Sequence, residues 1–335
     1  MNITASLFPA RAGGYDAVLR IQQVQATLDI LLQQVLNGLV LGSIYALVAL
    51  GYTMVYGIIG LINFAHGEIV MVGAMVTISV LTMLAGFGFA PGVLTLLLAI
   101  MIAAIVCMLM AQGMEKFAYR PLRKAPRLTP LILAIGISIF LQNLAMMIWG
   151  RGYKTFPEVV ETRPIEVFGA TITNVQMSIM VISVVIMFAL WLLVDKTRLG
   201  KAMRATAQNQ EVAGLMGINI NRVISATFVI GASLGAVAGV MRAVNYGQAD
   251  AYMGLLLGLK AFSAAVLGGI GNLFGAMAGG ILLGLIESLA AGYTGQITGG
   301  FLGANYQDIF AFIVLILVLL VRPNGLMGER QADRA

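Results

Sequence analysis

Nine long apolar runs, separated by polar loops, set the strongest limit on what this chain can fold into. Each run is close to the roughly 20 residues that an α-helix needs to cross a bilayer. None of them shows the ten-residue alternation of an outer-membrane barrel. Because backbone groups in lipid find no partners outside a helix, we predict an all-α fold, a polytopic transmembrane helical bundle of about eight to ten helices, some broken or re-entrant. The runs cover residues 30–57, 62–84, 92–112, 129–150, 173–194, 223–245, 251–268, 271–291 and 305–321.

Composition points to lipid as the main solvent of this chain. Hydrophobic residues make up 60% of it and charged residues only 10%, with a mean hydropathy of +0.95. A soluble domain carries about 25% charged residues. The single cysteine, Cys107, lies in an apolar run, so we expect a buried packing residue and no intramolecular disulfide framework. The chain is therefore predicted to be an integral membrane protein.

Lysines and arginines concentrate in loop 113–128, loop 195–222 and the C-terminal tail, residues 322–335. Loop 151–172, in contrast, balances its basic residues against glutamates. Because cytoplasmic loops of membrane proteins carry the excess of Lys and Arg, we predict that the first three regions are cytoplasmic and that loop 151–172 is external. The same distribution explains the net charge of +6 without a nucleic-acid site. The basic residues concerned are Lys116, Arg120, Arg123, Lys124, Arg127, Lys196, Arg198, Lys201, Arg204, Arg222, Arg322, Arg330 and Arg334.

The chain divides into a polar N-terminal extension (1–29), a transmembrane domain (30–321) and a cytoplasmic tail (322–335). No small-residue cleavage site follows a short apolar core in the extension, so we expect no cleaved signal peptide. If all nine runs cross the bilayer, the N-terminus lies outside and the C-terminus inside. A second crossing hidden in 30–57, or a re-entrant piece at the glycine-rich points Gly57–Gly60 and Gly268–Gly271, would change that count, and the sequence leaves this open.

Glycines recur every four residues in two of the runs. Small residues at this spacing let helix backbones approach closely, and van der Waals packing is the main attraction between helices in lipid. We therefore predict helix-packing faces there, with a surface along which helices slide as the alternative. The two rows are Gly231, Gly235 and Gly239, and Gly271, Gly275 and Gly279.

Four places put ionisable residues inside the apolar runs, at a cost of roughly 2.5–3.5 kcal/mol each on insertion scales. Such residues are candidates for function, and the first of the four places is His66 with Glu68. Arg242 lies near the outer end of its run and can extend its charge to the interface. Lys260 and Glu287 lie on consecutive runs, so they form either a structural ion pair across the bundle or a substrate contact.

The stretch GLINFAHGEI, residues 60–69, contains the only histidine of the chain. Asn63, His66 and Glu68 form a dense polar group there, with Tyr52 just upstream. Glycine weakens a helix, and the freed backbone groups then need polar partners or a wet cavity. Two compatible interpretations remain open: these residues stabilise a helix break, and such a break also lines a translocation path between half-helices in many transporters.

Nothing in the sequence predicts an enzyme, a metal site or a cofactor. One histidine beside one carboxylate is a poor metal site, and the chain has no HExxH motif, nucleophile elbow or phosphate-binding glycine loop.

Loop 195–222 is too long for a simple turn and too polar for lipid. Apolar residues recur at helical spacing in two short stretches, with a break near Asn209 and an end at Gly217. Lys201, Arg204 and Glu211 are largely turned away from these apolar positions. An amphipathic helix exposed in the cytoplasm suits a groove on a soluble partner. The apolar positions are Leu199, Ala202, Met203, Ala207, Val212, Leu215 and Met216.

Glu211-Val212-Ala213, followed by Gly217, resembles the EAA-xxx-G coupling motif of ABC importer permeases. It departs from the longer form of that motif, since Val212 replaces the first alanine and the downstream Ile-x-Leu-Pro is absent. The resemblance implies that Lys201, Arg204, Glu211, Ala213 and Gly217 belong to an element that contacts an ATP-binding subunit.

A broader resemblance covers residues 30–328. The segments 36–69, 200–219, 259–280 and 322–328 are similar to the branched-chain amino acid ABC importer permease family, in particular its high-affinity leucine/isoleucine/valine type. This resemblance implies a multi-pass subunit of the bacterial inner membrane without nucleotide chemistry of its own. Its expected partners are a second related permease, two cytoplasmic ATP-binding subunits and a periplasmic solute-binding protein.

Other functions remain open at this point. Relatives that carry urea, short amides or other amino acids look much the same. An ion-coupled secondary transporter could use Glu68, Lys260 and Glu287 as a relay, and a purely structural membrane subunit is a third alternative.

Overall fold

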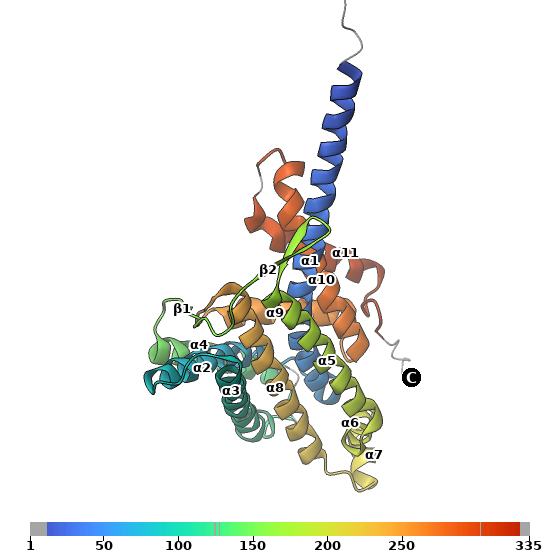
Figure 1. Cartoon of the computed structure of the whole chain (residues 1–335). Coiled ribbons are helices and arrows are strands. Elements are labelled where there is room, and N and C mark those ends of the chain that lie inside the picture. The colour runs from blue at the N-terminus through green and yellow to red at the C-terminus, as the bar shows by residue number, and fades with distance from the viewer. Residues whose placement is uncertain (1–11, 124, 127, 302, 329–335) are drawn as a thin grey trace, which may run out of the picture.

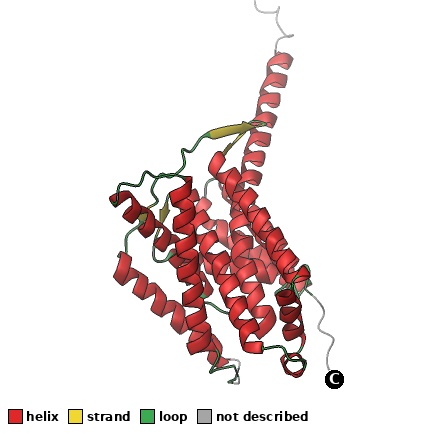
Figure 2. Cartoon of the chain, turned by 60° about the horizontal axis from the view of Figure 1, so that its bottom comes forward, coloured by secondary structure: helices red, strands yellow, loops and turns green. Residues whose placement is uncertain are grey.

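The structure is a computed structural model of the chain, and it describes residues 12–123, 125–126, 128–301 and 303–328. Helices make up most of this part, with four short strands (Figure 2). Nine of the helices coincide with the nine apolar runs. The main elements are α1 (Ala12–Ile59), α2 (His66–Gly86), α3 (Val93–Gly113), the π-helix η1 (Met114–Tyr119), α4 (Leu128–Trp149), β1 (Lys154–Thr155), β2 (Pro164–Val167), β3 (Ala170–Thr173), α5 (Asn174–Lys196), α6 (Arg198–Gln208), α7 (Gln210–Leu215), α8 (Ile220–Tyr246), β4 (Gln248–Ala249), α9 (Met253–Gly268), α10 (Leu273–Ile297), η2 (Ala304–Tyr306) and α11 (Gln307–Val321).

Within the described residues, seven helices are long and apolar enough to cross a membrane. They lie in α1, α2, α3 with η1, α4, α5, α8 and α10, whereas α9 and α11 are apolar but shorter. The predicted fold class, a polytopic helical membrane bundle, is confirmed.

Helix α1 is a single continuous helix of 48 residues, so the run at 30–57 hides no second crossing. At 1.5 Å per residue it is about 72 Å long, more than twice the roughly 30 Å of a hydrocarbon core. It begins inside the polar extension predicted for residues 1–29 and projects beyond the other helices (Figure 1). The first eleven residues lie outside the described part.

The centre of the bundle is built from α1, α2, α8 and α10. The span in α1 is 89% buried, compared with 17% for the span in α3 and η1. Helices α1 and α10 run antiparallel and pack on each other through glycines, since a Cβ built on Gly42 would lie 2.6 Å from the Cα of Ile281. A Cβ on Gly38 would lie 2.8 Å from the Cα of Leu285. Helices α3, α4 and α5 expose most of their apolar surface, as expected of helices in contact with lipid or another membrane subunit.

The loops gather at two ends of the bundle. At one end, Arg123 donates to Asn221 (2.7 Å), Gln210 donates to the Ile58 carbonyl (2.9 Å), and Asn272 donates to the Met327 carbonyl (2.9 Å). We call this the basic end: residues 56–61, 120–123, 195–222, 268–272 and 322–328. The described parts of the regions predicted to be cytoplasmic therefore share one end, whereas Lys124, Arg127, Arg330 and Arg334 lie outside the described residues.

The opposite end comprises residues 150–173 and 246–252. There β1 pairs with β4, β2 pairs with β3, and Gln33 of α1 hydrogen-bonds to the backbone of Thr171. Helices α6 and α7 lie at the far side of the molecule from the projecting part of α1 (Figure 1).

The two glycine-rich points are turns at the basic end. Helix α1 ends at Ile59 and is followed by Gly60 with φ +70°, while α9 ends at Gly268 and is followed by Gly269 with φ +108°. These left-handed conformations favour glycine. Gly271, predicted to pack helices, also lies in this turn with φ +95°, and a Cβ built on it would meet no atom within 4 Å. That prediction is wrong because α10 starts only at Leu273.

Candidate functional site

The amphipathic loop folds into α6 and α7, with the break at Asn209 as predicted. The Thr197 hydroxyl accepts the Gly200 N–H (3.1 Å) and so caps α6. The Asn209 side chain accepts the N–H groups of Glu211 and Val212 (3.0 and 3.1 Å) and so caps α7. These short side chains satisfy backbone donors that a helix start leaves free.

One face of this element packs on the bundle and the other is exposed. Met203 and Ala213 are buried, whereas Leu215 at the end of α7 and the next residue, Met216, are 87% and 79% exposed. Two large adjacent apolar side chains in water suggest a surface that a partner covers. Gly217, with φ +84°, ends the element as predicted.

The charged residues predicted to couple, Lys201, Arg204 and Glu211, are all exposed, but within the described residues only Arg204 is tied to a neighbouring helix. Arg204 donates to the Val194 carbonyl and lies 3.5 Å from Asp195, so it holds α6 against the end of α5. Gln210 binds the Ile58 carbonyl, which joins α7 directly to the end of α1.

A cavity of about 950 Å³ lies at the basic end. Its wall combines the end of α1, the α9–α10 turn, the end of α5 and the α6–α7 junction. Polar residues are prominent in this lining, among them Tyr56, Arg123, Asp195, Asn209 and Asn272.

The GLINFAHGEI stretch forms a helix break, and Asn63 holds it together. The Asn63 side-chain oxygen accepts the Ala65 N–H (3.1 Å) and the Tyr119 hydroxyl (2.7 Å). Its backbone carbonyl accepts the His66 N–H (3.0 Å). The non-helical backbone therefore has the partners that lipid would not supply.

The start of α2 lies deep in the bundle. The His66 ring is 2% exposed and contacts the edge of Tyr52, with ring centroids 4.8 Å apart. A Cβ built on Gly51 would lie only 2.3 Å from His66 Nε2. Since Gly51 lies about 12 Å along α1 from its end at Ile59, residues 60–65 run back into the bundle before α2 begins.

Glu68 is also enclosed. Its Oε1 accepts the Ser138 hydroxyl of α4 (3.0 Å), and a Cβ on Gly254 of α9 would lie 2.8 Å from Oε2. The described residues that line the 950 Å³ cavity do not include Tyr52, Asn63, His66 or Glu68. The geometry thus favours the helix-break interpretation over the lining of a path.

Lys260 and Glu287 do lie together. Lys260 hydrogen-bonds to Glu287 Oε1, and its Nζ is 2.8 Å from Oδ1 of Asp308 on α11. Asp308 lies at the end of an apolar run, where a charge is ordinary, so nothing in the sequence distinguishes it as a site residue. Arg242, in contrast, stacks over the Tyr246 ring, 4.9 Å from its centroid.

The remaining predicted glycines sit at close helix contacts. In α8, Gly231 faces Gly51, Gly235 faces His66 and Val70, and a Cβ on Gly239 would lie 2.0 Å from the Val70 carbonyl oxygen. In α10, Gly275 and Gly279 both pack against the end of α9 around Gly268.

A second charged cluster was missed by sequence analysis. Glu115 in η1 is fully buried and binds Arg120 (2.8 Å), Arg123 and the Ser225 hydroxyl of α8 (2.6 Å). The hydrogen bond to Glu115 raises the pKa of the Arg120 guanidinium above its ordinary value. The sequence does carry a signal for this cluster, because Glu115 is the one acidic residue beside the five basic residues of loop 113–128.

Seven described helices long enough to span a membrane, a buried helix break and an amphipathic element at the basic end are features of a polytopic membrane protein. The sequence model of the family described as branched-chain amino acid transport system permease component matches residues 34–319. The chain belongs to this family and is a multi-pass protein of the inner membrane.

Known relatives cover almost the whole chain. It is 45% identical to the high-affinity branched-chain amino acid transport system permease protein BraD of Pseudomonas aeruginosa, over 90% of this chain and 97% of the relative. It is 43% identical to the LivH protein of Escherichia coli K12 and 44% identical to LivH of Salmonella typhimurium, both described in the same words as BraD, with the same coverage. No solved structure matches the chain significantly.

Proposed function

We propose that this chain is the membrane permease of an ATP-driven ABC importer that takes up leucine, isoleucine and valine. The substrate class rests on the names of BraD and LivH, which both refer to branched-chain amino acids. The chain would work with a second related permease, two cytoplasmic ATP-binding subunits and a periplasmic solute-binding protein.

The observation that carries this proposal is the exposed apolar face of α7 at the basic end. Leu215 and Met216 have no reason to face water unless a partner covers them. An amphipathic helix that enters a hydrophobic groove is a common mode of recognition. We assign that groove to the ATP-binding subunit and the basic end to the cytoplasm.

A hydrogen bond connects α7 directly to a central helix of the bundle. Gln210 binds the end of α1, and both lie in the wall of the 950 Å³ cavity. A displacement of α7 by the ATP-binding subunit would therefore change the cavity on the cytoplasmic side. For ATP to drive this change, it must bind the two states of the complex with different affinity.

Energy dependence tests the proposal. The complex of this chain with its partner subunits is reconstituted in proteoliposomes, and uptake of labelled leucine is measured with and without enclosed ATP. We expect uptake that requires ATP and the solute-binding protein, and that valine and isoleucine compete for. Uptake driven by an ion gradient alone would instead establish a secondary transporter, and competition by urea or short amides but not by valine would establish a different substrate.

A further inference from the structure

The ion cluster of Lys260, Glu287 and Asp308 joins three helices and carries more acid than base. Two carboxylates share the single Lys260 ammonium group. Glu287 is 1% exposed, and its carboxylate has the Lys260 ammonium group and the Tyr45 hydroxyl as its polar neighbours. One negative charge is thus left without a direct counter-charge, which is costly away from water.

This cluster lies near the middle of the bundle. Glu287 is about 21 Å along α10 from its start at the basic end, and the helix continues for about 15 Å beyond it. Asp308 is about 20 Å from the end of α11 at the basic end. The charges are therefore at a depth where contact with hydrocarbon is expensive.

The cluster is nevertheless open on one side. The Asp308 side chain is 39% exposed and that of Lys260 is 17% exposed. Helix α11 also starts beside Glu287, so the chain returns from the opposite end toward the middle of the bundle, and the described residues 298–301 and 303 are outside regular helix. Charges and non-helical backbone at this depth occur where they line a water-filled cavity or contact protein.

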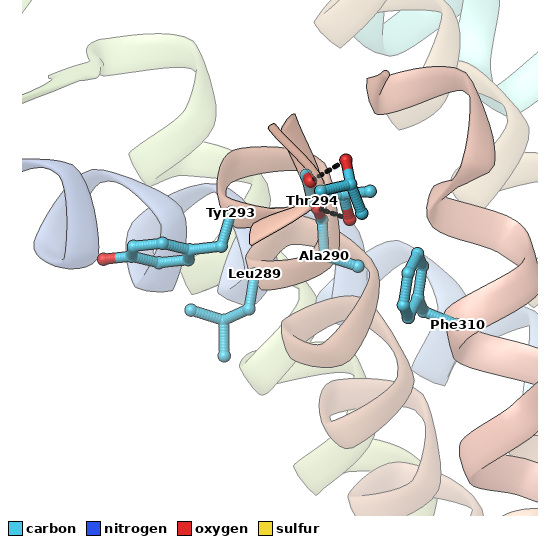
Figure 3. Close-up of a pocket in the computed structure, with 6 residues that line it drawn as sticks. Leu289, Ala290, Tyr293, Thr294 and Phe310 are labelled. Carbon is cyan, nitrogen blue, oxygen red and sulfur yellow. Dashed lines mark hydrogen bonds between the residues drawn. The ribbon is translucent and has the colours of Figure 1, made fainter. Parts of the chain in front are cut away.

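An apolar recess of about 420 Å³ adjoins the same stripe of α10. Ala290 and Thr294 follow Glu287 by three and seven residues, so the three share one face of the helix. Figure 3 shows Phe310 of α11 facing Ala290 and Thr294 across the recess. Its volume is within the range of small-molecule sites, about 300–1,000 Å³.

We propose that Lys260, Glu287 and Asp308, together with this recess, form a binding site for a zwitterionic amino acid halfway through the membrane. Glu287 and Asp308 receive the ammonium group, Lys260 receives the carboxylate, and the aliphatic side chain lies against Ala290 and Phe310. This inference rests on the proposed function and names the intramembrane contacts of its substrate.

Cysteine accessibility in the assembled importer tests this site. With Cys107→Ser as background, Ala290→Cys places a thiol in the recess, Thr294→Cys serves as a second reporter, and Val184→Cys on the exposed face of α5 is the control. A water-soluble methanethiosulfonate reagent is added during ATP-driven turnover, with and without saturating leucine. We expect reaction at residues 290 and 294, slowed several-fold by leucine, and no reaction at residue 184.

The charge requirement is tested in the same assay. Adding Asp308→Asn to the Ala290→Cys variant should leave the thiol reactive but remove the protection by leucine. Unreactive thiols at both reporters, equal rates with and without leucine, or protection that survives Asp308→Asn would overturn the site. If the unsubstituted importer takes up leucine with ATP while the site fails, only this inference is wrong; if it takes up no leucine, the proposed function itself fails.

Discussion

Two regions of this permease place ionisable groups at membrane depth, where contact with hydrocarbon is costly. One region encloses these groups in protein, and the other leaves them partly exposed. The break at Asn63–Glu68 is closed: its side chains are almost fully buried and fixed by Tyr119, Ser138 and the glycines of α1 and α8. The cluster of Lys260, Glu287 and Asp308 is partly open and has an excess of acid. A polar residue in a span is thus not sufficient evidence of a substrate path, and we interpret the enclosed region as a structural brace and the open one as a binding surface.

Removal of the Lys260 charge should have the largest effect. Lys260→Met leaves two carboxylates close together without a counter-charge, which costs about 3 kcal/mol or more when a buried pair is broken. We expect loss of leucine uptake and a lower unfolding temperature of the purified complex. Lys196→Met, which removes an exposed lysine at the end of α5, is the matched control and should change little. Equal uptake and equal unfolding temperatures of the two variants would show that the Lys260 charge is not required in the cluster.

Crowding of the closed region should have the next largest effect. Gly51→Ala pushes a methyl group into His66 Nε2, and overpacking of this kind costs about 1–3 kcal/mol. Gly57→Ala, whose Cβ would meet no atom closer than 3.6 Å, is the control on the same helix. We expect a reduced yield of folded complex for the first variant only.

A double variant sharpens this test. His66→Ala should recover part of the stability lost in Gly51→Ala, because the clash is between these two residues. Strict additivity of the two changes would contradict the packing described for the start of α2.

Neutralisation of Glu68 should have the smallest effect. Glu68→Gln keeps an oxygen that can accept the Ser138 hydroxyl and removes a charge that has no ion-pair partner among the described residues. We expect uptake close to that of the unsubstituted importer, whereas Glu287→Gln in the open cluster should reduce it clearly. Initial rates of leucine uptake at equal amounts of assembled complex decide this, and the reverse order would mean that the closed region contacts the substrate.

The sequence predicted those features that depend on local pattern. Apolar runs located nine helices, seven of which are long enough to cross a membrane, and side-chain periodicity with Asn209 and Gly217 located α6 and α7. Features that depend on contacts between distant segments were not accessible. Asp308 meets Lys260 only because the chain returns to the middle of the bundle before α11, and the burial of Glu115 depends on Ser225, more than one hundred residues away.

The role of the GLINFAHGEI stretch was also undecided from sequence alone. Its polar residues fit both a structural brace and the lining of a path, and the enclosure of His66 by Gly51 and Gly235 favours the brace. Gly271 belongs to a four-residue glycine repeat but lies before the start of α10 at Leu273. Such a repeat therefore does not show where a helix begins.

The central claim is that α7 transmits the work of an ATP-binding subunit to the bundle, and a single substitution on its exposed face tests this most directly. Leu215→Asp should leave the bundle folded, since the side chain touches water, while it abolishes ATP-driven leucine uptake and weakens co-purification of the ATP-binding subunit; Leu215→Met should retain both. Full ATP-driven uptake by the Leu215→Asp importer would contradict the account.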